Sequence, residues 1–496
     1  MTELSLLYHD YFHIDPAQIE MLGGAASNRR YYRMHHADGS TVIGVVGENA
    51  KENHAFIALS RHMSAQGLPV PAVLMASADE MRYLQTDLGQ VSLYDILKAQ
   101  PDAPSTHELL HRVMRTLPRL QFLTADGFDF ACDAFREPRF CLTTIRWDLN
   151  YFKYCFLKLT GYPMDELRLE EEFDRLTSQL LDHSEESGRW GFLYRDFQSR
   201  NVMVRDDEPW FIDFQGGYEG PLYYDVASFL WQTRAGYSPA LREELVATYV
   251  DALQPYQPIA LDVFRQRLNL FVFFRLLQTL GTYGYRGLFE HKAMFQTPIC
   301  QALHSLVELT PHLQPLCPYL CQILAEVSAM ERFQPHPATG PLTVRITSFS
   351  YKRGIPEDLS GNGGGFVFDC RAPLNPGRFS FYKRLTGLDD AVIDFLEGRR
   401  DEEGRLRPVQ AAEPAAQTDV LTSMQRFVQN VYALVDPAVQ TYLDRGFTSL
   451  VVNCGCTGGQ HRSVYCAQHL ADHLHARFPE ARIILCHREQ QVMRTY

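Results

Sequence analysis

The chain has 496 residues, 46% hydrophobic and 21% charged, a globular composition long enough for about two to four domains of roughly 100 to 200 residues. It opens on acidic and polar residues and contains no apolar run close to the roughly 18 residues of a membrane span. We therefore expect a cytoplasmic protein with no membrane partner. The eleven cysteines form no CxxC pair, which argues against a zinc site or a disulfide framework.

The net charge of −12 is distributed unevenly along the chain. Residues 341–496 hold 18 Lys and Arg against 17 Asp and Glu, or +1, and the remaining 29 against 42 give −13 to residues 1–340. The front of the chain therefore repels nucleic acid in bulk, whereas the back is neutral and suited to a local anion site.

Changes in sequence pattern divide the chain into four parts and a linker. Residues 1–84 show short strands and one helix, residues 85–89 (QTDLG) a hinge, and residues 90–331 a long series of helices. Residues 332–341 contain three prolines in ten positions and predict a linker, after which 342–496 begins at once with a strand. We predict an α+β, protein-kinase-like bilobal fold, followed by an α/β domain with a parallel sheet.

The segment 22–33 (LGGAASNRRYYR) places small residues at an expected turn between two strands of the first lobe. Backbone amides at Gly24 and Ser27 would approach ATP phosphates closely there, although a small-residue hairpin without a ligand shows the same pattern. The hinge would read adenine through backbone hydrogen bonds between Gln85 and Leu88.

Residues 191–232 carry the strongest signal for chemistry. A short apolar strand leads to Asp196, Asn201 follows five residues later, and a second strand delivers Asp213. Phosphoryl transfer needs such a set: one carboxylate, Asp196, positions the acceptor hydroxyl and takes its proton, while Asn201 and Asp213 hold the Mg²⁺ ions that neutralise the ATP phosphates. A polar hairpin whose Asp and Asn only cap turns is the structural alternative.

This segment resembles the aminoglycoside-phosphotransferase and choline-kinase superfamily, whose motif H-x-D-x-x-x-x-N is followed by I-D-F/W. The strings YRDFQSRNVM, IDFQGG and GPLYYDVASFL are closer still to the anomeric N-acetylmuramate and N-acetylglucosamine kinases, over most of residues 20–290. The resemblance implies a kinase domain of this type over residues 1–331. Tyr194 stands where the motif usually has His, at a structural position, and Asp225 matches an aspartate that braces the catalytic loop.

The same resemblance suggests how phosphate and sugar are bound. The strand 41–46 lacks the lysine that most kinases place there, as these amino-sugar kinases also do, and they carry arginines in S-x-R-R-Y-x-R. Residues 146–156 align loosely with a sugar-binding segment, or else form an amphipathic helix with core aromatics. The resemblance thus implies phosphate contacts, in place of merely exposed strand arginines, at Arg29, Arg30 and Arg33, and acceptor contacts at Asp148 and Tyr151.

Near the end of the chain, an apolar strand over 450–454 leads into a glycine-rich loop over 455–460 and a helix over 461–478. In such a strand–loop–helix arrangement, free amides and the positive end of the helix dipole converge on an anion. Arg462 would add a bidentate donor, unless the loop only packs the helix closely. Cys456 and Arg462 also fit C-x-x-G-x-x-R-S, the cysteine-phosphatase loop, in which a thiolate attacks phosphorus.

The back of the chain resembles the C-terminal domain of the RNase adaptor RapZ. SFSYKRGIP, FVFDCRAPLNP, LTGLDDAV, NCGCTGGQHRSV and CHRE match it in order over about 340–490. The resemblance implies a domain over 342–496 that binds glucosamine-6-phosphate and, in full-length RapZ, regulatory RNA. GxxxxGK[ST] and a lysine-rich tail are absent from the sequence, so we do not expect RNA as a partner. The implied phosphosugar pocket consists of Lys352, Arg371, Cys456, Thr457, Gly458, Gly459, His461, Arg462 and Ser463.

Together these patterns predict an ATP- and Mg²⁺-dependent kinase, with N-acetylmuramate or N-acetylglucosamine as acceptor, fused to a phosphosugar-binding regulatory domain. Two alternatives stay open: a RapZ-type adaptor that binds nucleotide without turnover, and a kinase fused to a cysteine-dependent phosphatase. The intact Asp196, Asn201 and Asp213 argue against the adaptor. The reactivity of Cys456 separates the phosphatase from a binding domain.

Overall fold

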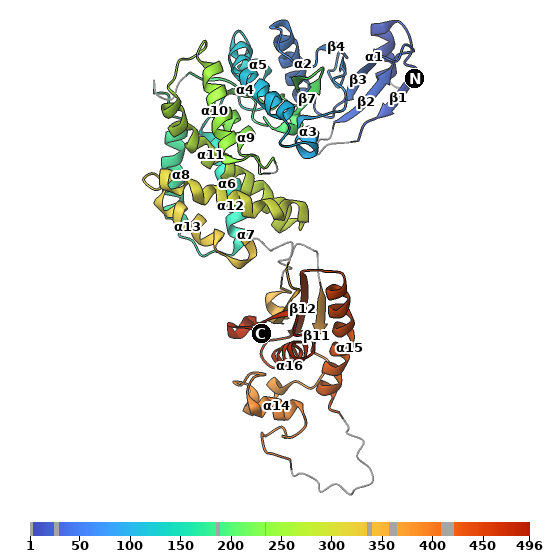
Figure 1. Cartoon of the computed structure of the whole chain (residues 1–496), viewed down its shortest axis with the longest axis vertical. Helices are drawn as coiled ribbons and strands as arrows, with labels where there is room; N and C mark the ends of the chain where they lie inside the picture. The colour runs from blue at the N-terminus through green and yellow to red at the C-terminus, as the bar shows by residue number, and fades with distance from the viewer. Residues whose placement is uncertain are drawn as a thin grey trace. The chain divides into compact units, whose positions relative to one another are not determined.

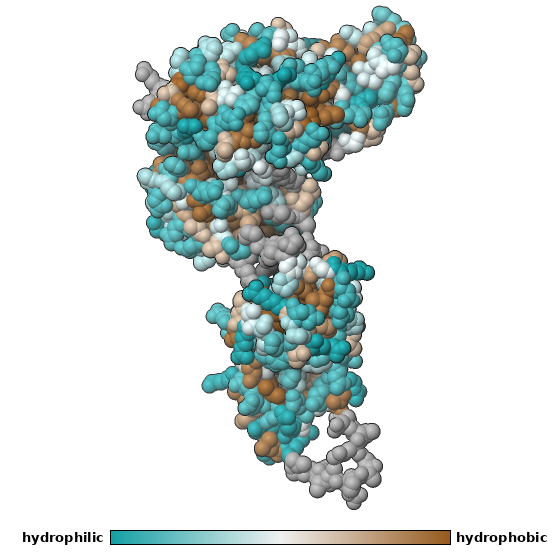
Figure 2. All heavy atoms as spheres, in the orientation of Figure 1, coloured by the Kyte–Doolittle hydropathy of each residue, from teal (hydrophilic) through white to brown (hydrophobic). Residues whose placement is uncertain are grey.

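The computed structural model describes residues 3–23, 29–184, 189–233, 235–334, 340–356, 365–407 and 421–496. The chain divides into two compact units, Met1–Phe333 and Gln334–Tyr496 (Figure 1). In the described ranges, no helix combines the length and the apolar character that crossing a membrane requires. On the face shown in Figure 2, hydrophobic residues are interspersed with polar ones.

The first lobe is built on a five-stranded antiparallel sheet with the order β1-β2-β3-β5-β4. Its β3 (TVIGVV) is rich in β-branched residues, and its four central residues are buried. A Cβ on Gly44 would lie 2.8 Å from both Leu4 and Met34, so the glycine allows helix α1 to pack on the sheet. The elements are α1(Glu3–Phe12), β1(Gln18–Met21), β2(Arg30–His35), β3(Thr41–Val46), α2(Ala50–Ala65), β4(Val73–Ala76) and β5(Arg82–Thr86).

The second lobe is helical, with one long helix, α11, packed against α6, α9 and α12. Most residues of α11 between Leu268 and Gly281 are buried, which places this helix at the centre of the lobe. The helices are α3(Leu93–Ala99), α4(Pro104–Ala125), α5(Phe130–Asp133), α6(Leu142–Phe152), α7(Lys158–Thr160), α8(Glu166–Leu180), α9(Tyr223–Leu230), α10(Pro239–Leu253), α11(Leu261–Tyr283), α12(Ala293–Leu313) and α13(Pro318–Ser328).

The segment from β6 to α9 in this lobe contains two short antiparallel strand pairs. Strand β6(Gly191–Leu193) pairs with β9(Tyr218–Gly220), and β7(Val202–Arg205) pairs with β8(Glu208–Phe211). The turn between β7 and β8 contains Asp206 and Asp207, both with a positive φ, of 54° and 60°. Asp tolerates this left-handed conformation better than most residues, which explains the acidic turn.

The second unit is an α/β domain whose sheet has the order β11-β12-β10-β13-β14. All neighbours pair in parallel except β14, which is antiparallel to β13. In the parallel register Ser350 lies beside Cys456 and Ser348 beside His487, so these carboxyl ends share one edge. The elements are β10(Thr343–Ser350), β11(Phe366–Asp369), α14(Asp390–Leu396), α15(Ser423–Asp444), β12(Ser449–Cys456), α16(Arg462–Arg477), β13(Arg482–His487) and β14(Val492–Thr495).

Candidate functional site

The segment between β6 and β9 brings Asp196, Asn201 and Asp213 together. The Asn201 Nδ2 atom donates to the Asp196 carbonyl at 2.8 Å and to Asp213 Oδ2 at 3.4 Å. The backbone amide of Ile212 donates to the Asn201 carbonyl at 3.0 Å, which ties the two halves of the hairpin together. The Asp196 side chain is exposed, so its carboxylate can accept a proton from an incoming hydroxyl.

The Asp213 carboxylate has the surroundings of a cation ligand. Removal of water by the surrounding protein raises the pKa of Asp213, and the negative charges of Asp196 and Glu52 raise it further, against hydrogen bonding by Gln215 and the charge of Arg29. A divalent cation would relieve this repulsion. Because the Asn201 amide nitrogen is used on protein acceptors, its side-chain oxygen remains for the same cation. These residues therefore fit a Mg²⁺-type ion.

Asp225, on α9, fixes the backbone that leads into Asp196. It is fully buried, and its two carboxylate oxygens accept the backbone amides of Tyr194 at 2.8 Å and Arg195 at 3.0 Å. The Tyr194 hydroxyl donates to the Ile212 carbonyl, next to Asp213. Burial raises the pKa of Asp225 to about 7, although the two amides act in the opposite direction. The phenol of Tyr194 thus links the backbone before Asp196 to the backbone before Asp213.

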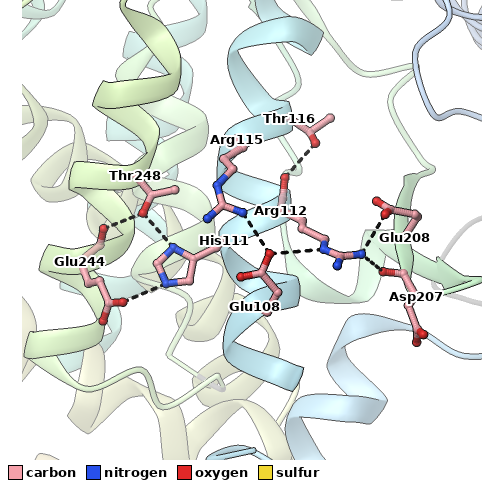
Figure 3. A network of polar contacts seen from close by, with 9 residues as sticks. All are labelled: Glu108, His111, Arg112, Arg115, Thr116, Asp207, Glu208, Glu244 and Thr248. Carbon is pink, nitrogen blue, oxygen red and sulfur yellow. Dashed lines mark hydrogen bonds and ion pairs between the residues drawn. The ribbon is translucent and has the colours of Figure 1, made fainter. Parts of the chain in front are cut away.

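The β7–β8 hairpin is also fixed from outside, by α4 (Figure 3). Arg112 donates to the Asp207 carbonyl at 2.9 Å and pairs with Glu208 at 2.8 Å. Glu108, one turn earlier on α4, pairs with Arg115 at 3.0 Å and lies 3.4 Å from the Arg112 Nε atom. The turn between Asn201 and Asp213 is therefore held by a network of α4 side chains.

The first lobe contributes an ion pair that sequence reasoning missed. Arg29 lies immediately before β2 and is buried, and its Nη2 atom is 3.2 Å from Glu52 Oε1 and 3.1 Å from the Glu52 carbonyl. Gln215 Nε2 donates to Glu52 at 3.4 Å and to Asp213 at 2.9 Å. A chain of contacts therefore runs from Arg29 through Glu52 and Gln215 to Asp213. The feature of the sequence that could have indicated this pair was Glu52, an acidic residue in the first turn of α2.

The other expected nucleotide contacts are placed differently. Arg33 is buried and makes a bidentate pair with Asp87, at 2.5 and 3.2 Å, plus a bond to the Gly89 carbonyl at 3.1 Å. It therefore fixes the hinge, and the structure does not bring it to Arg29. Arg30 is exposed on β2, whereas Gln85 and Leu88 are buried at the hinge. Gly24 and Ser27 lie outside the described residues.

The expected acceptor residues lie on α6, beside the catalytic loop. Asp148 is buried, and its Oδ1 atom is 3.4 Å from Arg195 Nη2, while Arg195 Nη1 donates to the Tyr218 hydroxyl at 3.0 Å. Burial raises the pKa of Asp148 against the charges of Arg195 and Arg275. Tyr151 is half-buried, with its ring 6.4 Å from that of Tyr285. Arg195, next to Asp196, is a site residue that sequence reasoning missed.

In the second unit, Cys456 ends β12 and lies at the floor of the glycine-rich loop, 3% exposed. Its Sγ atom is 3.1 Å from the Ser463 hydroxyl. Burial acts to raise the pKa of Cys456, but hydrogen bonds from Ser463 and from the amides of Gly459 and Gln460 lower it below the usual thiol value. Thr457 and Gly458 are exposed at the mouth of the loop.

Gly459 has a φ of 64°, and an added Cβ would lie 2.5 Å from Glu489 and 2.8 Å from the Ser350 amide nitrogen. Only glycine fits this position. Arg462 opens α16, is 5% exposed, and donates through Nη1 to the carbonyls of Arg371 at 2.6 Å and Pro373 at 2.7 Å. The loop is thus held in one conformation from both sides.

The remaining residues of the expected phosphosugar pocket differ in exposure. His461 is buried, with Nε2 at 2.9 Å from the Tyr382 carbonyl, and burial lowers its pKa, so the structure does not direct it to the mouth. Arg371 is exposed, pairs with Asp369 at 2.6 Å and lies over the Tyr351 ring at 4.4 Å. Lys352 is exposed next to them. The structure therefore places the cations of Lys352 and Arg371 at the protein surface and the Cys456 thiol at the buried base of the glycine-rich loop.

Each of the two units matches a known protein family. The phosphotransferase enzyme family matches residues 18–259, and the RapZ C-terminal domain matches residues 342–413 and 402–491. The chain joins a phosphotransferase domain to a RapZ C-terminal domain. These matches confirm the resemblance to the phosphotransferase superfamily and that to the RapZ C-terminal domain, together with the kinase-like and α/β folds, whereas the closer resemblance to amino-sugar kinases stays a prediction.

Curated relatives and solved structures extend the comparison. A nucleotide-binding protein of Paramagnetospirillum magneticum is 32% identical over 152 residues, 31% of this chain and 40% of that protein. One from Paraburkholderia phymatum is 34% identical over 164 residues, 33% of this chain and 44% of that protein. The chain therefore spans about two fifths of the length of these relatives.

Among solved structures, an amicoumacin kinase in complex with AMP-PNP, Ca²⁺ and Ami is 15% identical with a TM-score of 0.44, over 60% of this chain and 93% of that one. A choline kinase from Cryptosporidium parvum is 11% identical with a TM-score of 0.43, over 62% and 93% of the two chains.

Proposed function

We propose that the phosphotransferase domain transfers the γ-phosphoryl group of ATP to a hydroxyl of an N-acetylated amino sugar, N-acetylmuramate or N-acetylglucosamine. The observation that carries this proposal is the exposed carboxylate of Asp196 beside the Asn201–Asp213 pair. A bound Mg²⁺ would neutralise charge on the phosphates, held by Asn201 and Asp213. The RapZ C-terminal domain would bind a sugar phosphate at its glycine-rich loop.

Each side chain then has one task. Asp196 orients the acceptor hydroxyl and takes its proton as the oxygen attacks phosphorus. Arg29, fixed by Glu52, supplies a buried positive charge where most kinases use a lysine. Arg195 and Asp148, 3.4 Å apart, offer charged hydrogen-bonding groups beside Asp196 for the hydroxyl groups of the acceptor.

Two substitutions test the phosphotransferase assignment. Asp196→Ala should lower kcat about 10²- to 10⁴-fold with little change in ATP affinity, because the proton acceptor is lost. Asp213→Ala should instead remove metal-dependent ATP binding, measured by calorimetry with and without Mg²⁺. Asp10→Ala, an exposed carboxylate on α1, is the control. Near wild-type rates in both site variants would reject the kinase, and ATP binding without turnover in the wild type would favour an adaptor.

The acceptor is identified by a screen of N-acetylated amino sugars with ATP, following ADP release and product mass. Proton-coupled phosphorus NMR of the product should show linkage to the anomeric carbon. Linkage at C6 would retain the kinase and reject the anomeric assignment.

A further inference from the structure

The glycine-rich loop of the RapZ C-terminal domain has the chemistry of a nucleophile. Three other cysteines of this domain are buried as deeply as Cys456, namely Cys370, Cys454 and Cys466. Their Sγ atoms lie within 4.8 Å of one another, and the pKa of each is raised well above the usual value. Cys456 differs because three backbone amides and a hydroxyl donate to its sulfur. These donors are not a consequence of burial alone. They would stabilise a negative charge on the Cys456 sulfur.

Arg462 supplies a second, independent observation. It is 5% exposed, and its Nη1 atom is fixed by two backbone carbonyls. Its Nε atom is buried and has no hydrogen-bond partner among the residues that the structure describes. The charge of Arg462 interacts with the thiol of Cys456. A buried guanidinium with an unused donor, whose charge interacts with a hydrogen-bonded thiol, indicates an anionic ligand that accepts from it.

Spacing and topology agree with this interpretation. Cys456 ends β12, Arg462 follows after five residues and opens α16, and Ser463 comes next with its hydroxyl 3.1 Å from the sulfur. The backbone amides of Gly459, Gln460 and Ser463 donate to the sulfur, so amide dipoles converge at this end of the loop. Thr457 and Gly458 are exposed at the mouth of this loop.

We propose that this loop hydrolyses small phosphate monoesters, with Cys456 as the nucleophile and Arg462 as the phosphate-binding cation. The Cys456 thiolate forms a bond to phosphorus as the ester P–O bond breaks, and the leaving oxygen takes a proton from water. A second water then attacks the phosphocysteine and gives a proton to the hydroxide left by the first, the S–P bond breaks, inorganic phosphate leaves and the thiolate is restored. The sum is one ester and one water giving one alcohol and one phosphate, with no oxidant or reductant. This activity goes beyond phosphosugar binding at the loop.

The test uses the full chain without ATP, so that the phosphotransferase domain contributes no turnover. Phosphate release is measured from p-nitrophenyl phosphate and from glucosamine-6-phosphate, for the wild type, Cys456→Ser, Arg462→Ala and a thiol control, Cys486→Ser. Cys456→Ser should lose at least a hundredfold in release while still binding inorganic phosphate in calorimetry, and Arg462→Ala should lose both. Cys486→Ser, half-buried on β13, should match the wild type. Thermal unfolding verifies that each variant is folded.

The intermediate gives a readout that does not depend on folding of a variant. Rapid acid quench of the wild type with either ester should show one added phosphoryl group on the peptide containing Cys456. Binding of glucosamine-6-phosphate without phosphate release from either ester would overturn the proposal and leave a binding domain. Release that persists in Cys456→Ser would also overturn it. Ser463→Ala should shift the pH at which iodoacetamide alkylates Cys456 upward, and an unchanged profile would contradict the role of that hydroxyl.

Discussion

Single residues of the phosphotransferase domain differ in how firmly they are held. Asp196 is exposed, whereas Asp213 accepts hydrogen bonds from Asn201 and Gln215 and has a left-handed φ of 67°. Such strained, fixed residues are typical of positions where geometry must not vary. Asp196, the proposed proton acceptor, is thus less restrained than Asp213, the proposed cation ligand.

Glu52→Gln should lower kcat/KM for ATP about 10- to 100-fold. The substitution removes the carboxylate that pairs with the buried guanidinium of Arg29, and breaking a charge-assisted contact costs about 1.5 to 3 kcal/mol. Glu48→Gln, an exposed residue just before α2, should have no effect. Equal kinetics for the two variants would show that the Arg29–Glu52 pair has no part in nucleotide use.

Asp225 gives the domain a predictable pH dependence of stability. Its pKa in the folded chain is about 7, above the usual aspartate value of about 3.9, so the folded chain binds the extra proton between these values. The contribution of this group is therefore fully present below about pH 4 and is lost as the pH rises to about 7. In urea unfolding from pH 4 to 8, the stability of the wild type should fall relative to that of Asp225→Asn as the pH rises, because the amide of the variant does not titrate. A difference independent of pH would exclude this titration.

At the scale of elements, the β7–β8 hairpin depends on α4. Arg112→Ala removes a bond to the Asp207 carbonyl and the pair with Glu208, whereas Arg115→Ala removes only a pair with Glu108 (Figure 3). We expect faster amide hydrogen exchange at Met203 and Trp210, which pair with each other in the hairpin, and a few-fold lower kcat, in Arg112→Ala alone. The same exchange rates in both variants would show that the α4 network does not stabilise the hairpin.

The hairpin and the glycine-rich loop were predictable because each depends on neighbours in sequence. Asp196, Asn201 and Asp213 lie within 18 positions, counted inclusively, and Cys456 and Arg462 lie within one strand–loop–helix unit. Local spacing therefore fixed which of these side chains would meet. Helix α11 was predictable for the same reason, from its apolar stripe.

Contacts between distant segments were not predictable in the same way. Glu52 meets Gln215 across 163 positions, and Arg195 lies near Asp148 across 47. Arg33 carries the same charge as Arg29, yet Asp87 pairs with it at the hinge. Charge alone indicates that an arginine needs a partner, and only the folded chain determines which partner it finds.

For the whole molecule, the two units should fold independently. The hydrophobic core of the phosphotransferase domain and that of the RapZ C-terminal domain share no residue among those described. Separate chains 1–333 and 334–496 should each unfold in one cooperative transition, and 1–333 should keep kcat within about twofold of the full chain. Loss of activity from a folded 1–333 fragment, measured by ADP release, would show that the second unit supports catalysis.

The parallel sheet of the second unit also affects how the protein is made. Strand β10 is synthesised before both of its neighbours, since β12 begins only at Ser449 and β13 at Arg482. At about 5 to 20 residues per second, a ribosome needs about 5 to 20 seconds to pass from Ser350 to Ser449. During that interval the apolar Val344 and Ile346 belong to a strand with two unpaired edges, which other nascent chains can meet. Translation is consequently the stage at which this domain is most prone to aggregate.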